Sequence, residues 1–150
     1  MAEAPGGGQP RLFVTDEGDP ASDPAWIERV VAAALERGAR PDAEVSLLLT
    51  DDAEIARVHG EYLGDPTPTD VISFELDDTI DLVVSVECAV RRATAAGSEV
   101  AAEVALYVVH GILHACGFDD HEAADRARMR AAERDVLRVL GVTVAPVDAD

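Results

Sequence analysis

Apolar residues follow a helical spacing in some segments of the chain and a strand-like spacing in others. Five segments place apolar residues every three or four positions, as one face of a helix requires: 23–38, 51–64, 86–97, 98–116 and 123–141. Four shorter segments are rich in β-forming residues: 11–17, 43–51, 70–76 and 79–87. Only Asp77 and Asp78 separate the last two, so they predict a hairpin. This order predicts an α+β fold, an α/β sandwich in which one mixed four-stranded sheet packs with about five helices.

The chain length suits one domain. Residues 11–142 contain every predicted element and form the predicted domain. Residues 1–10 are rich in Gly and Pro and are predicted to be a disordered tail, and residues 143–150 are predicted to be a short acidic tail. No apolar run reaches the roughly 18–20 residues that span a bilayer. The N-terminus also lacks the basic-then-apolar layout of a signal peptide. We therefore expect one cytoplasmic domain without a membrane partner.

Charge narrows the choice of partners. The 150 residues carry a formal net charge of −18, and every basic side chain is an arginine. Such an acidic surface disfavours nonspecific adhesion to nucleic acid or anionic lipid, although it is compatible with a locally basic or metal-loaded cleft. Cys88 and Cys116 lie in apolar helical segments and predict buried free thiols rather than a disulfide scaffold.

The stretch HGILHACGFDDH, residues 110–121, carries three of the four histidines. His110 and His114 are four residues apart and therefore share one face of a helix. A single histidine on an apolar helix is most often a hydrogen-bonded core residue, but a pair at this spacing favours Zn²⁺. Gly117 is suited to ending the helix in a left-handed turn. The chain would then reverse and bring a third ligand back towards the same helix face, from Asp119, Asp120 or His121.

Gly111 occupies the position that holds the general base of H-E-x-x-H metalloproteases. The segment therefore predicts a zincin-like metal helix that lacks the glutamate needed to cut peptides. The absent side chain either leaves room beside the metal or lets another element pack closely.

Two further motifs accompany this helix: PTDVISFEL at 68–76, and the spacing of Met129 and Glu133 in the last predicted helix. The combination resembles the YbeY-type endoribonucleases, also called rRNA maturation factors. The resemblance implies a single-strand-type endoribonuclease with one catalytic Zn²⁺ per chain and with His110 and His114 as its first two ligands. The predicted domain would therefore be a metal-dependent hydrolase domain. It also implies action in maturation of the small-subunit ribosomal RNA 3′ end and in ribosome quality control. The partners would be ribosomal RNA and the small ribosomal subunit, and no DNA is expected.

The chain departs from the family pattern at the third ligand. Counted from Gly117, the family's third histidine falls at Asp120, and His121 comes one residue later. Imidazole is the better zinc ligand, so we expect His121 to be the third catalytic zinc ligand, with Asp120 as the alternative. Whichever of the two does not bind zinc would orient one of the imidazoles. A second departure is that Leu63 and Asp65 stand where the family commonly has Arg and Lys.

RNA cleavage also requires a cation near the phosphate. Arg91 and Arg92 follow a predicted strand and are the first candidates; the others are Arg126, Arg128 and Arg130. For each of them the plainer interpretation is a solvated helix face. His59 lies within a predicted helix and reads as a surface or packing residue.

Thr69, Asp70 and Ser73 open a predicted strand, where they either line a substrate groove or only fix a turn. Two alternatives to an RNA-cleaving enzyme stay open. One is a metal hydrolase of another substrate, which Gly111 argues against for peptides. The other is a non-catalytic ribosome-associated zinc protein. This alternative stays open because Leu63 and Asp65 replace basic residues that would help to hold RNA.

Overall fold

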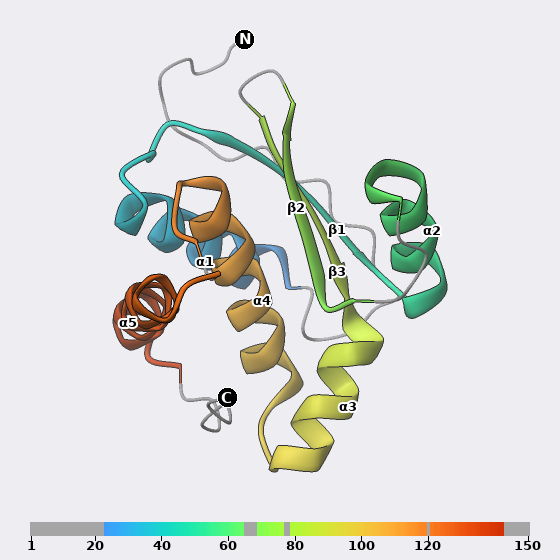
Figure 1. Cartoon of the computed structure of the whole chain (residues 1–150). Coiled ribbons are helices and arrows are strands. Elements are labelled where there is room, and N and C mark those ends of the chain that lie inside the picture. The colour runs from blue at the N-terminus through green and yellow to red at the C-terminus, as the bar shows by residue number, and fades with distance from the viewer. Residues whose placement is uncertain (1–22, 65–68, 77–78, 120, 143–150) are drawn as a thin grey trace, which may run out of the picture.

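The computed structural model describes residues 23–64, 69–76, 79–119 and 121–142 (Figure 1). Its elements, in chain order, are α1 (Pro24–Arg37), β1 (Glu44–Thr50), α2 (Asp52–Leu63), β2 (Val71–Leu76), β3 (Thr79–Ser85), α3 (Val86–Ala96), α4 (Val100–Ala115) and α5 (Ala123–Leu140). All five predicted helices are present. The strand predicted at 11–17, the two predicted tails and the turn at 77–78 lie outside the described residues. Among the described helices, none combines the length and apolarity needed to cross a bilayer.

The described strands form one mixed sheet in the order β1-β3-β2. β1 runs parallel to β3, with Leu47 opposite Leu82, and β2 runs antiparallel to β3, with Ile72 opposite Val83. The predicted mixed sheet and hairpin are thus confirmed. The described sheet has three strands rather than four, and β2 forms one of its edges.

The two faces of the sheet pack against different helices. On one face, alternate residues of β1 and β3 enter the main core with α1 and α4; they are Val45, Leu47, Leu49, Ile80, Leu82 and Val84. On the other face, Ile72 and Val83 pack with Ile55 and Val58 of α2. The alternation follows from the strand period of two.

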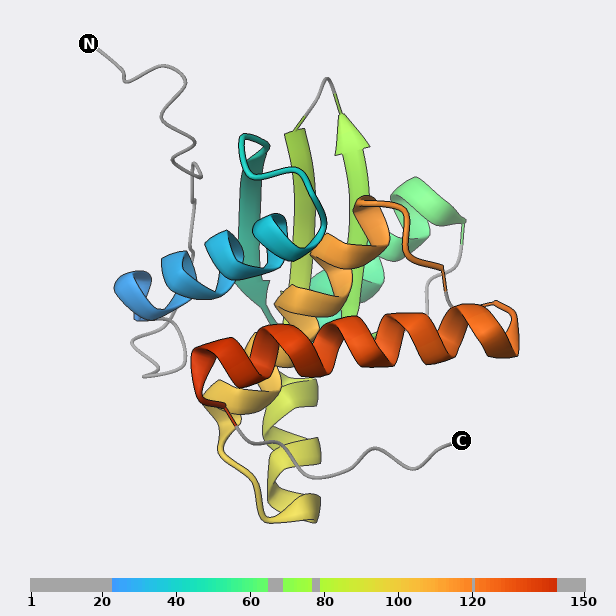
Figure 2. The same cartoon turned by 90° about the vertical axis from the view of Figure 1, so that its left-hand side faces the viewer.

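α4 is the central helix and is buried on most of its surface. Figure 2 shows α5 crossing in front of α4, with the sheet behind them and α2 on the far side. α4 contacts α1, α3, α5 and the sheet, which explains why its apolar residues run nearly all round. Cys88 is buried and Cys116 half-buried, and both are free thiols, as predicted.

One predicted boundary is wrong. The strand expected at 79–87 ends at Ser85, and α3 begins at Val86. The Ser85 hydroxyl accepts a hydrogen bond from the backbone N–H of Cys88 at 3.1 Å, which caps the helix. Because residues 82–86 are apolar apart from this serine, the predicted strand extends two residues too far, whereas the helix begins where it was predicted.

Gly111 marks a close approach between α4 and the sheet. A Cβ at this position would lie 2.7 Å from Cδ2 of Leu82 and 3.2 Å from Cγ2 of Val71. The Ser73 hydroxyl donates a hydrogen bond to the Gly111 carbonyl at 2.9 Å. Of the two roles considered for this glycine, the structure supports close packing: the missing side chain lets β2 lie directly against the helix that carries the histidines.

Candidate functional site

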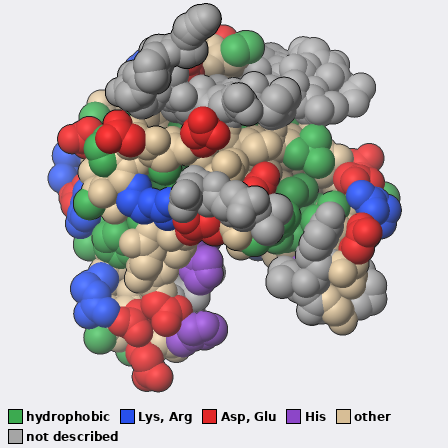
Figure 3. Space-filling view, turned by 90° about the horizontal axis from the view of Figure 1, so that it is seen from above, with side chains coloured by type: hydrophobic (Ala, Val, Ile, Leu, Met, Phe, Trp, Pro, Cys, Tyr) green, Lys and Arg blue, Asp and Glu red, His purple; other side chains and the backbone are tan. Residues whose placement is uncertain are grey.

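His110 and His114 lie one turn apart on α4 and line the same cavity of about 320 Å³. The same cavity is lined by Thr69 and Asp70, which precede β2, and by Ser73 of β2. Figure 3 shows histidine side chains along one wall of a deep hollow in the surface. The structure therefore brings together two of the predicted metal ligands and three of the predicted substrate-binding residues.

The imidazole of His110 is oriented by α5. Its Nδ1 lies 2.6 Å from Oε2 of Glu133. The glutamate side chain is only 8% exposed, and that of His110 is 33% exposed. A carboxylate accepts hydrogen bonds, so the pair places the ring proton on Nδ1 and leaves the lone pair on Nε2. Metal-binding histidines typically make this same contact with a carboxylate through the nitrogen that does not bind the metal.

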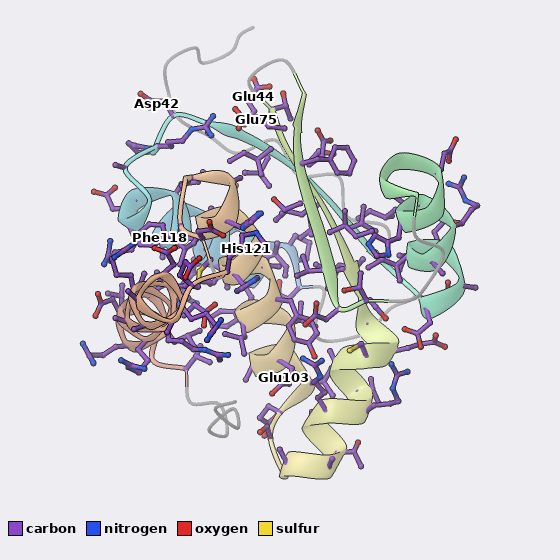
Figure 4. The ribbon with its side chains drawn as sticks, viewed as in Figure 1. Asp42, Glu44, Glu75, Glu103, Phe118 and His121 are labelled. Atoms are coloured by element: carbon purple, nitrogen blue, oxygen red, sulfur yellow. The ribbon has the colours of Figure 1, made fainter. Side chains whose placement is uncertain are left out.

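The third predicted ligand is not placed beside this pair. The side chain of His121 is 80% exposed, and its Nε2 lies 3.5 Å from Oδ1 of Asp119. Figure 4 labels His121 in the connection between α4 and α5. Asp120 lies outside the described residues. Within the described part of the chain, no three His, Cys, Asp or Glu side chains are grouped closely enough to hold a metal ion.

The predicted turn after the histidines is present. Gly117 has a φ of 107°, in the left-handed region that favours glycine. The backbone N–H of Phe118 donates back to the carbonyl of Leu113 at 3.0 Å. The chain thus reverses at the end of α4, as the sequence predicts, and passes from the histidine helix into α5.

Asp70 joins the start of β2 to α3. Its Oδ1 accepts hydrogen bonds from the Val71 backbone N–H at 2.8 Å and from the Thr69 hydroxyl at 3.4 Å. Its Oδ2 accepts one from Arg92 at 3.1 Å. The carboxylate therefore fixes the turn, one of the two roles predicted for this segment, and also holds the guanidinium of Arg92.

The two neighbouring arginines differ in their contacts. Arg91 donates to Oδ2 of Asp52 at 2.6 Å, while the Ser85 hydroxyl donates to the other oxygen of that carboxylate, also at 2.6 Å. The hydrogen bond from Arg91, followed by that from Ser85, lowers the pKa of the Asp52 carboxyl. Arg91 thus ties α3 to α2 and does not line the histidine cavity.

Two residues near the site were not assigned to it from the sequence. Glu133 lies on the buried face of α5 among Met129, Ala132 and Val136. A charged residue on an otherwise apolar stripe is a signal that a partner is present. His59 of α2 lines the cavity that His110 and His114 also line. Sequence spacing gave no indication of this, because α2 lies on the opposite side of the sheet from α4.

Comparison with known proteins agrees with the family resemblance of the sequence motifs. The family model described as Endoribonuclease YbeY matches residues 16–141. A relative from Heliobacterium modesticaldum, named Endoribonuclease YbeY, is 33% identical over 87% of this chain and 96% of its own. One of the same name from a Roseiflexus species is 40% identical over 81% of this chain and 86% of its own. A solution structure from Thermotoga maritima matches the fold with a TM-score of 0.60 at 21% identity, covering 86% of this chain and 91% of the other.

Proposed function

Because the chain belongs to the YbeY endoribonuclease family, we propose that it is an RNA-cleaving hydrolase that depends on one zinc ion bound at His110 and His114. The observation that carries the zinc proposal is the pair of imidazoles on one cavity wall, one of them hydrogen-bonded to a buried carboxylate. A histidine present only for packing would not require this arrangement.

The residues fit the metal by their donor chemistry. Zinc binds imidazole nitrogen at about 2.0–2.1 Å and carboxylate oxygen at about 2.0–2.2 Å. The contact with Glu133 engages Nδ1 of His110, so Nε2 is the ring nitrogen that would bind the metal. We propose that the third ligand is His121 or Asp120 from the connection between α4 and α5. When bound, zinc would act as a Lewis acid towards the scissile phosphate.

The chain's own residues then position the RNA. β2 is an edge of the described sheet, and its first residues line the same cavity as the histidines, so an extended RNA segment would lie along this edge beside them. The Ser73 hydroxyl holds the backbone of α4 against β2 and so fixes the position of the histidine helix relative to this strand. Glu133 holds the His110 ring in one orientation.

For the biological role, we propose maturation of the small-subunit ribosomal RNA 3′ end and ribosome quality control, in the cytoplasm. The resemblance of the three motifs supports this substrate. The net charge of −18 gives the free protein little long-range attraction to RNA. Binding of RNA by the free protein is therefore expected to be weak, and a small ribosomal subunit that holds the RNA in place would strengthen it.

The test uses purified full-length protein and a precursor of the small-subunit RNA. We expect cleavage at a defined position that is lost on chelation, recovers when zinc is returned, and is lost in His114→Ala. The matched control is His59→Ala, which changes a histidine of the same cavity that is not a proposed ligand and is expected to leave the zinc content unchanged. Cleavage that persists after chelation and in His114→Ala would refute zinc dependence. Protein that holds zinc, cuts no RNA and still cosediments with small subunits would favour the non-catalytic alternative.

The third ligand needs a separate measurement. Zinc content and zinc affinity are compared in Asp120→Ala and His121→Ala. The substitution that removes the ligand is expected to lower the affinity strongly, whereas the other changes it less. Equal affinity in both variants and in the unsubstituted chain would show that neither residue binds zinc.

A further inference from the structure

A second cavity, of about 150 Å³, adjoins the histidine cavity and shares His110 and Asp70 with it. We call it the arginine cavity, because Arg92, Arg126 and Arg130 all line it. These three side chains come from α3 and α5, which are distant in sequence. A chain with 12 basic and 30 acidic side chains thus gathers three arginines on one small cavity beside its histidines.

Contacts with the protein fix two of the three guanidinium groups. Arg92 donates to Asp70 at 3.1 Å, and its guanidinium lies over the ring of Tyr107, 5.7 Å from the centroid. Arg126 donates to the backbone carbonyl of His121 at 3.0 Å. The positions of these charges therefore require little further ordering when a ligand binds.

Arg130 differs from both. It is half-buried, and no hydrogen bond or ion pair joins it to another residue in the described part of the chain. The two carboxylates of the cavity are already engaged, Asp70 with Arg92 and Glu133 with His110. A half-buried guanidinium with unused donors favours an external anion, and its planar fork suits the paired oxygens of a phosphate.

We propose that the arginine cavity binds a phosphodiester of single-stranded RNA next to the one at the histidine pair, with Arg130 as its principal contact. The inference rests on the proposed function, because it concerns a second contact with the same substrate. The structure also distinguishes among the arginines that the sequence offers equally as candidate phosphate contacts. Arg91 is paired with Asp52 and Arg128 with Asp125, and neither lines this cavity.

The experiment measures binding of a short fluorescent single-stranded oligoribonucleotide over a range of salt concentrations, with the full chain carrying His114→Ala to prevent cleavage. Each phosphate contact to single-stranded nucleic acid contributes about 0.7 to the slope of log affinity against log salt. We expect Arg130→Gln to reduce that slope by about 0.7. Arg130→Lys should retain the slope, because it keeps the charge.

Arg128→Gln is the matched control. It removes the same charge from the same helix two residues away, at a side chain that is 67% exposed. We expect it to leave the slope unchanged, and thermal unfolding of all variants should coincide with that of the parent chain. Equal slopes for Arg130→Gln and Arg128→Gln would overturn the proposal, as would an absence of measurable RNA binding by the parent chain.

The outcomes separate this inference from the proposed function. A chain that binds RNA with the expected dependence on Arg130 but never cuts it would disprove the endoribonuclease proposal and leave the arginine cavity standing. A chain that cuts RNA, but whose Arg130→Gln and Arg128→Gln variants have indistinguishable salt slopes, would support the endoribonuclease proposal and disprove the role of the arginine cavity.

Discussion

Replacing Gly111 by alanine tests how closely α4 must pack against the sheet. Two effects oppose each other. Alanine is favoured over glycine in a helix interior by about 1 kcal/mol. Against this, the new Cβ would lie 2.7 Å from Cδ2 of Leu82, a core side chain that is only 1% exposed.

The steric effect is expected to be the larger. The two carbons must separate by roughly 0.8 Å to reach an ordinary contact of about 3.5 Å. Inserting a methyl group into a packed core costs about 1–3 kcal/mol. We therefore expect Gly111→Ala to lower the free energy of unfolding by about 1 kcal/mol after the helical gain is subtracted. The shift would also lengthen the hydrogen bond from Ser73 to the Gly111 carbonyl.

Urea unfolding measures this change, with Ala127→Gly on the exposed face of α5 as the calibration of helix propensity in the same protein. Leu82→Val shortens the opposing side chain, so the double variant should be more stable than the sum of the single changes predicts. If Gly111→Ala is instead more stable than the parent by the full propensity difference, and shows no coupling to Leu82→Val, the close approach does not constrain the helix.

Three further outcomes are expected. Glu133→Gln should weaken zinc binding by about 10–100-fold, measured by competition with a chromophoric chelator; unchanged affinity would show that the carboxylate does not orient His110. Arg91 lowers the pKa of the Asp52 carboxyl in the folded state. The ionised carboxylate therefore stabilises the fold at a pH above its unfolded-state pKa of about 3.9, and this stabilisation is lost as the pH falls through the folded-state pKa. Asp52→Asn should therefore flatten the acid limb of urea stability against pH, and an unaltered limb would contradict this. Burial raises the pKa of the Cys116 thiol, so in a Cys88→Ser background alkylation at neutral pH should be slower in the native chain than in urea; equal rates would count against a buried thiol.

Local sequence was sufficient to predict the helices. Asp23 and Asp51 precede α1 and α2, and their carboxylates accept hydrogen bonds from Ala25 and Glu54 backbone N–H groups at 3.1 and 2.8 Å. Such caps involve neighbours in sequence and can be recognised without knowledge of the fold. The strand predicted at 79–87 extended into the helix because a strand and a helix follow each other within one apolar run, where local spacing does not separate them.

The histidine pair could be predicted because its geometry is internal to one helix. The partners of the site could not, because they depend on how separate elements pack. His110 and Glu133 are 23 residues apart on different helices. Arg91 and Arg92 are adjacent and chemically identical, but neighbouring helical residues point roughly 100° apart. Only the placement of α3 beside α2 and β2 determines that one of them joins Asp52 and the other Asp70.

The contact between His110 and Glu133 also sets an order of events during translation. Glu133 belongs to the last described helix and is added to the growing chain 23 residues after His110. At about 5–20 residues per second, that delay is about 1–5 seconds. Throughout it, the imidazole already exists while its acceptor has not been synthesised. The ring can acquire its final orientation only once α5 has emerged and docked, so a nascent chain interrupted earlier would carry the histidines without their alignment.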